Sequence, residues 1–165
     1  DGINAFNGHL NLLKKAKAET VMTPHPGEFA RIMGVTPQDV NADRIGMGNR
    51  FVKKYGTNLL LKGARSILFT ADGGVFINPT GNPALAKGGS GDILTGFIGG
   101  LAAQGYTLAQ SAIVSTYLHG YAADMWRDHT GSDMDLLAGD LLNGLGRVMK
   151  EIEHGEERIY IEKSL

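Results

Sequence analysis

A glycine-rich segment, residues 78–92, joins a short β-prone run to a long apolar run that is typical of a helix. It reads Asn-Pro-Thr-Gly-Asn-Pro-Ala-Leu-Ala-Lys-Gly-Gly-Ser-Gly-Asp, and Gly88, Gly89 and Gly91 stand at the expected start of the helix. The first N–H groups of a helix have no acceptor within the helix, and the helix dipole favours an anion there. Glycines let these groups approach phosphate oxygens without a clash from Cβ. The segment therefore predicts an anion-binding turn at a strand–helix junction.

An acidic residue, Asp92, follows these glycines in the first turn of the expected helix. Phosphates repel a carboxylate at this place, yet it is well placed to accept a proton from a hydroxyl that attacks the terminal phosphorus. The alternative is that Asp92 only caps the helix and that the glycines only pack. The segment is not a P-loop, because no Lys-Ser or Lys-Thr pair follows the glycines. It is not a dinucleotide fingerprint either, because Leu94 occupies the third glycine position.

Hydrophobic spacing and turn residues predict an α/β order of elements along the chain. We expect helices at 1–18, 27–33, 37–55, 91–104, 107–128 and 135–154, and strands at 19–23, 58–62, 66–70, 75–78 and 158–161. The run Leu59-Leu60-Leu61 predicts a strand buried on both faces, as in a parallel sheet, and Asp72-Gly73-Gly74 predicts a hairpin. The sequence thus predicts a central, mostly parallel sheet flanked by helices. Because the strands are few and the first element is a helix, we expect residues 1–165 to form the C-terminal portion of one larger domain.

Composition narrows the classes of function. The 16 Lys and Arg residues nearly balance the 17 Asp and Glu residues, which argues against a nucleic-acid-binding surface. The chain has no cysteine, so disulfides, thiol catalysis and cysteine-ligated zinc are excluded. No segment reaches the ~18 apolar residues of a membrane span. We therefore expect neither nucleic acid nor membrane among the partners.

Two short segments with polar side chains follow expected strands. His25 and Glu28 come directly after the strand at 19–23, and Lys62 and Gly63 come at the end of the strand at 58–62. Open α/β sheets bind ligands at the carboxyl ends of their strands, where a lysine can balance phosphate charge. The alternatives are that His25 caps the next helix, that Glu28 is a solvated first-turn acid and that Lys62 is an exposed turn residue.

A group of polar residues lies in or just after the expected helix at 107–128: His119, Asp124, Asp128 and His129. Metal ligands on a helix need a spacing of three or four residues on one face. Asp124 and Asp128 meet this requirement, whereas His119 and Asp124 do not. We therefore expect a solvated helix face here rather than a metal site.

Three ordered segments resemble those of the nucleotide-dependent NAD(P)H-hydrate dehydratases, which belong to the ribokinase-like superfamily. Residues 78–96 resemble the signature of this family, residues 23–31 its substrate segment and residues 61–66 its nucleotide segment. Residues 1–4 resemble the end of its Asp-Ala-Asp-Gly-Leu-Asn motif. The resemblance runs from Asp1 to about Leu142 and implies a ribokinase-like fold whose N-terminal portion precedes this chain.

The resemblance also implies the site residues, with Asp92 as the catalytic base. The residues expected to bind the substrate are His25, Pro26, Gly27, Glu28, Phe29, Arg31 and Asp92. Those expected to bind ADP or ATP are Lys62, Gly63, Ala64, Arg65, Ser66, Asn82, Lys87, Gly88, Gly89, Ser90 and Gly91. Mg²⁺ is expected with the nucleotide, and Glu28 is expected to help hold it through water, as the Asn-x-x-Glu segment of ribokinase-like kinases does.

The implied activity is the repair of hydrated NADH and NADPH by an ADP- or ATP-dependent lyase. The hydroxyl of the hydrated nicotinamide ring is phosphorylated, phosphate leaves and the ring double bond is restored. One alternative is a ribokinase-like kinase of a small alcohol such as hydroxyethylthiazole, because fold alone does not separate these functions. Another is an inactive nucleotide-binding fragment that pairs with a chain supplying the N-terminal part. The resemblance also leads us to expect a cytoplasmic homo-oligomer.

Overall fold

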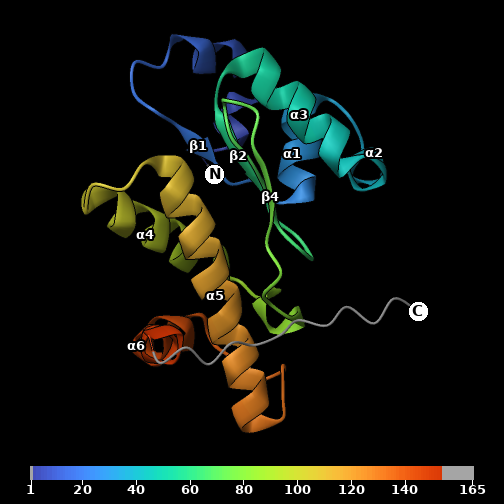
Figure 1. The fold of residues 1–165 in the computed structure, drawn as a ribbon. Helices are drawn as coiled ribbons and strands as arrows, with labels where there is room; N and C mark the ends of the chain where they lie inside the picture. Colours follow the sequence, from blue (N-terminus) through green and yellow to red (C-terminus); the bar gives the residue numbers. More distant parts are fainter. Residues whose placement is uncertain (1, 154–165) are drawn as a thin grey trace.

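Four short strands form the sheet at the centre of the computed structural model, which describes residues 2–153 (Figure 1). In sheet order, the strands are β1 (Val21–Met22), β2 (Asn58–Leu61), β3 (Ile67–Phe69) and β4 (Val75–Ile77). β1 runs parallel to β2, whereas β3 is antiparallel to both β2 and β4. The predicted hairpin is confirmed, but the described sheet is mixed rather than mostly parallel. The connections between β2, β3 and β4 are too short for the crossover that parallel neighbours need.

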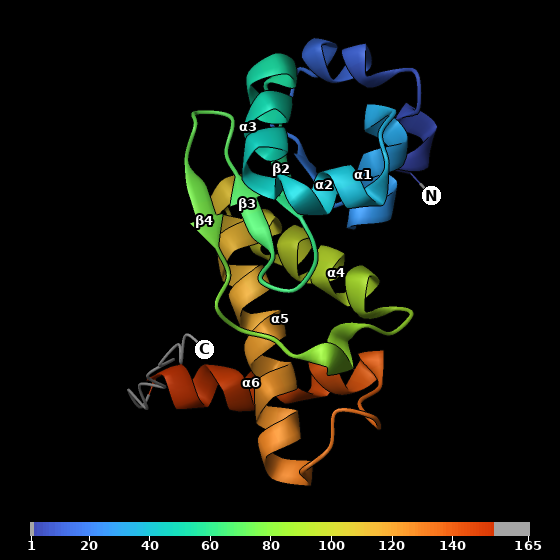
Figure 2. The ribbon, with the colours of Figure 1, turned by 90° about the vertical axis from the view of Figure 1, so that its right-hand side faces the viewer.

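The helices cover both faces of this sheet (Figure 2). They are α1 (Pro26–Met33), α2 (Pro37–Ala42), α3 (Arg44–Tyr55), α4 (Ser90–Ala103), α5 (Leu108–Thr130) and α6 (Ala138–Glu153), with short 3-10 helices η1 (Asn4–Phe6), η2 (Leu10–Lys15) and η3 (Pro83–Leu85). The α/β fold and the helices predicted at 27–33, 91–104, 107–128 and 135–154 are confirmed, with ends shifted by a few residues. None of the helices within residues 2–153 is long and apolar enough to cross a bilayer.

The leucine run of β2 lies between two layers of helices. Leu59 and Leu61 are completely buried in the core cluster formed with α1 and α3, whereas Leu60 packs in a separate cluster with α4 and α5. Full burial of one leucine side chain contributes about 1.5–3 kcal/mol. The predicted burial of this strand on both faces is thus confirmed.

Two of the predicted helices are interrupted. The helix expected at 37–55 is divided into α2 and α3 at Asp43, whose backbone leaves the helical region and whose side chain accepts the N–H of Gly46. An aspartate can compete with the helix for its own backbone in this way. The helix expected at 1–18 consists of η1 and η2, separated by the turn residues Asn7 and Gly8. The strand expected at 158–161 lies outside the described residues.

The solvated face predicted for α5 is wrong for two of its four polar residues. His119 is 6% exposed and Asp124 is 4% exposed, whereas Asp128 and His129 are exposed. His119 Nε2 lies 3.0 Å from the carbonyl oxygen of Ser90. Because a carbonyl only accepts, the ring nitrogen donates to it. α5 is therefore attached by a buried histidine to the first residue of α4.

Burial lowers the pKa of His119 to about 4. The hydrogen bond to Ser90 opposes this shift, and the positive charge of Lys62 adds to it. The ring is therefore neutral at neutral pH and becomes protonated in the folded protein only under acidic conditions.

We predict that acid destabilises the protein through His119. The unfolded chain takes up this proton near pH 6.5 and the folded protein only near pH 4, so the contribution is complete above pH 6.5 and is lost as the pH falls between these values. The full difference is worth about 3 kcal/mol. Urea unfolding at a series of pH values should show this loss in the wild type and a shallower dependence in His119→Gln, which keeps a donor but does not titrate. Parallel curves for the two proteins would contradict the assignment.

Candidate functional site

The carboxyl ends of β1 and β2 lie side by side. The backbone N–H of Lys62, directly after β2, donates to the carbonyl of Pro24, which follows β1, at 2.9 Å. Because the two strands are parallel, the segments that leave them emerge at the same edge of the sheet. The structure thus brings together the predicted segments at 23–31 and 61–66.

The glycine-rich turn reaches the same edge. A Cβ placed on Gly91 would lie 3.1 Å from the Nζ of Lys62, so the lysine ammonium group lies against the first turn of α4. Asp92 is exposed in that turn. Lys62, the glycine turn and Asp92 therefore form one cluster, drawn from segments that are far apart in the chain.

The start of α4 differs from the starts of the helices before it and after it. His25, Thr36, Asp43 and Thr107 accept hydrogen bonds from first-turn N–H groups of α1, α2, α3 and α5. At α4 the capping position is Gly89, whose φ of +88° is the left-handed conformation that glycine adopts easily, and no side chain caps the helix. The alternative in which Asp92 caps α4 therefore does not describe this structure. The N–H groups of Ser90 and Asp92 donate to the carbonyls of Lys87 and Gly89 at 3.4 and 3.1 Å, so the N–H groups of Gly88, Gly89 and Gly91 are the donors left for an external anion.

His25 and Glu28 make a reciprocal cap at the start of α1. The Nδ1 of His25 accepts the N–H groups of Gly27 and Glu28 at 3.1 and 3.3 Å, and Glu28 Oε2 accepts the N–H of His25 at 2.7 Å. The capping alternative left open by the sequence is thus the geometry observed. The His25 side chain is still 57% exposed. The cap therefore fixes an accessible imidazole at the carboxyl edge of β1.

Other residues of the predicted substrate segment have structural contacts. Phe29 is completely buried in the core, with its ring centroid 5.5 Å from that of Phe51, so a contact with substrate would come from its backbone, and the predicted contact stays a prediction. Arg31 Nη1 donates to Asn4 Oδ1 at 2.8 Å and joins α1 to η1. Pro26 is the first residue of α1, where a missing N–H costs nothing.

An arginine that the sequence analysis did not identify organises the turn after β2. Arg44, at the start of α3, donates to the carbonyl of Ala64 at 2.8 Å and to that of Leu61 at 3.1 Å. Burial lowers the pKa of this guanidinium group, which still stays protonated because arginine titrates far above neutral pH. No local sequence signal links Arg44 to a turn so far along the chain.

The remaining residues of this turn are held locally. Ser66 Oγ donates to the carbonyl of Gly63 at 3.2 Å. Arg65 adopts a left-handed backbone conformation, with φ of 56°, and is exposed. Predicted contacts of Gly63, Ala64, Arg65 and Ser66 with a nucleotide stay predictions.

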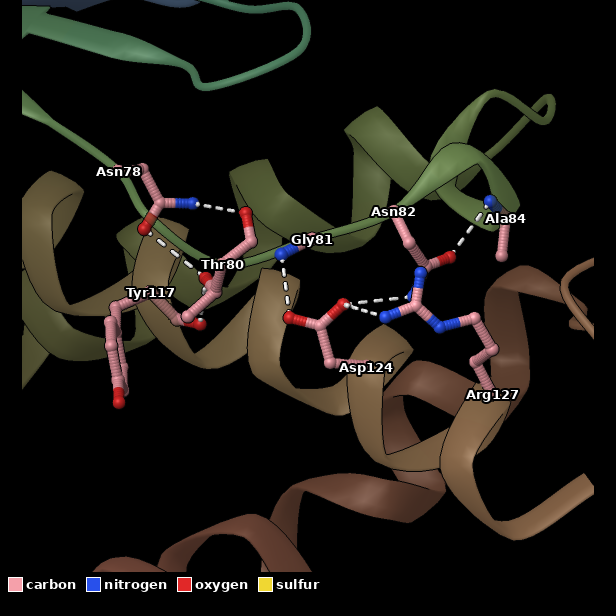
Figure 3. Close-up of polar contacts among 8 residues, drawn as sticks. All are labelled: Asn78, Thr80, Gly81, Asn82, Ala84, Tyr117, Asp124 and Arg127. Carbon is pink, nitrogen blue, oxygen red and sulfur yellow. Dashed lines mark hydrogen bonds and ion pairs between the residues drawn. The ribbon is translucent and has the colours of Figure 1, made fainter. Parts of the chain in front are cut away.

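Three residues of the loop at 78–90 that were expected to bind the nucleotide have side chains already hydrogen-bonded to other groups of the protein. Asn82 accepts the N–H of Ala84 at 3.0 Å through Oδ1 and donates to Asp124 at 2.9 Å through Nδ2 (Figure 3). Lys87 donates to the carbonyls of Met134 and Leu136. Ser90 Oγ donates to the carbonyl of Leu85 at 2.7 Å. These side chains shape the loop, and its contacts with a ligand are left to the backbone.

The arrangement suits phosphoryl transfer. Free backbone donors and a lysine can hold a polyphosphate, and a carboxylate beside them can accept a proton from an attacking hydroxyl. Within residues 2–153, no group of three or more histidine, aspartate or glutamate side chains could hold a metal ion.

Comparison with known proteins agrees with this chemistry. The family profile described as NAD(P)H-hydrate dehydratase matches residues 1–143. The bifunctional NAD(P)H-hydrate repair enzyme Nnr of Moorella thermoacetica is 42% identical over 159 residues, which make up 96% of this chain and 30% of the relative.

Solved structures extend the likeness to the fold. An ADP/ATP-dependent NAD(P)H-hydrate dehydratase from Bacillus subtilis, co-crystallized with ATP/Mg²⁺, is similar with a TM-score of 0.77 and 38% identity over 81% of this chain and 48% of that chain. A ribokinase-like superfamily protein from Enterococcus faecalis gives a TM-score of 0.67 and 29% identity over 86% of this chain and 50% of that chain. This chain thus spans half or less of the length of these three proteins. The expected ribokinase-like architecture is confirmed, and the chain belongs to the NAD(P)H-hydrate dehydratase family.

Proposed function

We propose that this chain carries the nucleotide-binding and catalytic corner of an ADP- or ATP-dependent dehydratase that converts hydrated NADH and NADPH back to NADH and NADPH. One observation carries the proposal: the uncapped start of α4 lies against Lys62 and holds Asp92 exposed in its first turn. Membership of the family supplies the substrate class. Since the chain spans 48% of the Bacillus subtilis structure, the rest of the substrate pocket would come from outside these residues.

The terminal phosphates of the nucleotide would lie against the backbone N–H groups of Gly88, Gly89 and Gly91. These donors belong to a formed helix and a held loop, so they need no reorganisation when charge develops on the transferring phosphoryl group. The ammonium group of Lys62 would offset the negative charge of the phosphates from the side of β2. Binding and catalysis would thus use the same donors.

Asp92 would accept the proton of the substrate hydroxyl. As the hydroxyl oxygen bonds to the terminal phosphorus, the bond from that phosphorus to the rest of the nucleotide breaks, and the nucleotide leaves with the electron pair. Phosphate then leaves the ring carbon with the pair of the C–O bond, and loss of a proton from the neighbouring ring carbon restores the double bond. The net result is the removal of water from the ring and of one phosphate from the nucleotide.

The residues present fit a Mg²⁺ ion that arrives with the nucleotide. Such an ion is held mainly by phosphates and water, and it shields phosphate charge, so it needs few protein ligands. Oε2 of Glu28 is occupied by the N–H of His25, so Glu28 would help hold the Mg²⁺ ion through a water molecule and not by direct coordination. The exposed imidazole of His25 would face the substrate at the same edge of the sheet.

The alcohol kinase and the inactive fragment stay as alternatives that the reaction products can separate. The family membership and the named activities of the relatives favour repair. Self-association and a cytoplasmic location stay predictions.

We predict that the purified protein, given hydrated NADH, Mg²⁺ and ADP or ATP, restores the absorbance of reduced nicotinamide and releases one phosphate per turnover. Absorbance and phosphate are followed together, with reactions lacking the nucleotide as the control. A stable phosphorylated alcohol, with no recovery of absorbance, would support a kinase instead. No turnover with any of these substrates would support the inactive fragment.

We predict that Asp92→Asn lowers kcat about a hundredfold to ten-thousandfold, because the hydroxyl loses its proton acceptor. Nucleotide binding, measured by calorimetry, should persist, since the amide donors are unchanged. Asp128→Asn, which alters an exposed carboxylate on α5, is the matched control and should keep full turnover. Full turnover by Asp92→Asn would remove the assigned base.

We predict that Lys62→Met weakens nucleotide affinity about tenfold to a hundredfold, because a charged donor to phosphate is lost. Lys53→Met, at an exposed position on α3, should leave the affinity unchanged. Equal affinities for the wild type and both variants would show that Lys62 does not reach the phosphates.

A further inference from the structure

A buried carboxylate on α5 holds the first half of the glycine-rich loop. Oδ2 of Asp124 accepts the backbone N–H of Gly81 at 2.8 Å, and Oδ1 accepts the Nδ2–H of Asn82 at 2.9 Å (Figure 3). The Asp124 side chain is 6% exposed, and the Nη2 of Arg127 lies 3.9 Å from Oδ1. Removing a carboxylate from water is costly unless its oxygens are hydrogen-bonded. Here both oxygens accept from the loop.

The preceding loop residues, Asn78 and Thr80, also contact α5. Thr80 Oγ1 donates to the carbonyl of Tyr117 at 2.9 Å (Figure 3). Asn78 Nδ2 lies 3.3 Å from the carbonyl of Thr116. A Cβ on Gly120 would lie 2.2 Å from Thr80 Oγ1, so only glycine allows the loop to approach this closely. The contact with Asp124 is therefore one end of a continuous seam between the loop and α5.

A chain of hydrogen bonds connects this anchored part of the loop to the start of α4. Asn82, fixed by Asp124, accepts the N–H of Ala84 and so starts η3. The carbonyl of Leu85, at the end of η3, accepts from Ser90 Oγ, and the carbonyl of Ser90 bonds to His119 on α5. The loop is thus attached to α5 at both ends, with the glycine turn at the second attachment.

We propose that Asp124 is a positioning residue that sets where the N–H groups of the glycine turn and Asp92 lie. The carboxylate suits this place because it offers two acceptor oxygens and no donor, which matches the two loop donors that face it. An asparagine would present an NH₂ group to one of those donors. This role rests on the proposed function only in that the turn is taken to bind the nucleotide.

The test compares Asp124→Asn with Asp128→Asn, which changes an exposed carboxylate on the same helix. Hydrogen–deuterium exchange of the purified proteins should rise about tenfold or more in residues 79–92 of Asp124→Asn, because a buried donor loses its acceptor. Exchange in β2 should stay unchanged, and exchange in residues 79–92 should stay unchanged in the control. If Asp124→Asn does not fold, Asn82→Ala is measured in its place; it keeps the bond from the Gly81 N–H to Asp124 and removes the Asn82 bond to Asp124 together with the cap of Ala84.

A swapped pair gives the sharpest version of this experiment. In Asn82→Asp combined with Asp124→Asn, position 124 can still accept from Gly81, while its NH₂ group donates to the carboxylate at 82. Exchange in the loop should return toward the wild-type rate. A loop that exchanges at the wild-type rate in Asp124→Asn, or one that the swap does not restore, overturns the proposal.

Kinetics separate positioning from general stability. In Asp124→Asn, kcat/KM for the nucleotide should fall about tenfold to a hundredfold. The KM for hydrated NADH should change less than that for the nucleotide, because Asp92 is the one residue expected to bind hydrated NADH that lies at the end of this loop. A looser loop with unchanged kcat/KM for the nucleotide overturns the positioning role. Failure of the wild type to turn over hydrated NADH overturns the proposed function instead, and the exchange measurement then decides alone whether Asp124 holds the loop.

Discussion

The N–H groups of Gly88, Gly89 and Gly91 lie at the start of α4, where no capping side chain provides an acceptor for them. In a helix that begins at a sheet edge beside a lysine, this deficit attracts an anion, and a polyphosphate satisfies several donors at once. Lys62 and Asp92 can take part in the proposed phosphoryl transfer only because they lie beside these N–H groups. The proposed chemistry therefore depends on a backbone feature more than on any single side chain.

Holding such a turn open requires support from the rest of the fold. β2 is buried on both faces, which fixes the edge from which Lys62 projects. α5 passes behind the loop and anchors it through Thr80, Asp124 and His119. The buried side chains of Asp124 and His119 on α5 thus hold the loop through the backbone groups of Gly81 and Ser90.

Sequence patterns predicted the parts of this structure that depend on local chemistry. The leucine run, the Asp72–Gly74 hairpin and the glycine turn each carry their signal within a few residues, and all three lie where expected. The break at Asp43, the turn held by Arg44 and the loop held by Asp124 depend on partners that only folding brings close. Asp124 is 42 residues from Asn82, so its burial could not be read from helical spacing. The burial of Phe29 was missed as well, since a residue inside a functional motif can still face the core.

The most direct measurement of the central claim is the response of individual backbone amides to the nucleotide. Two-dimensional amide NMR of the purified protein, titrated with ADP and Mg²⁺, should show saturable shifts at Gly88, Gly89 and Gly91 as the largest changes. Amides at the opposite ends of the strands, such as Gly56 and Thr57, should not move. Saturable binding that shifts those amides and leaves the glycine turn unchanged would contradict the account.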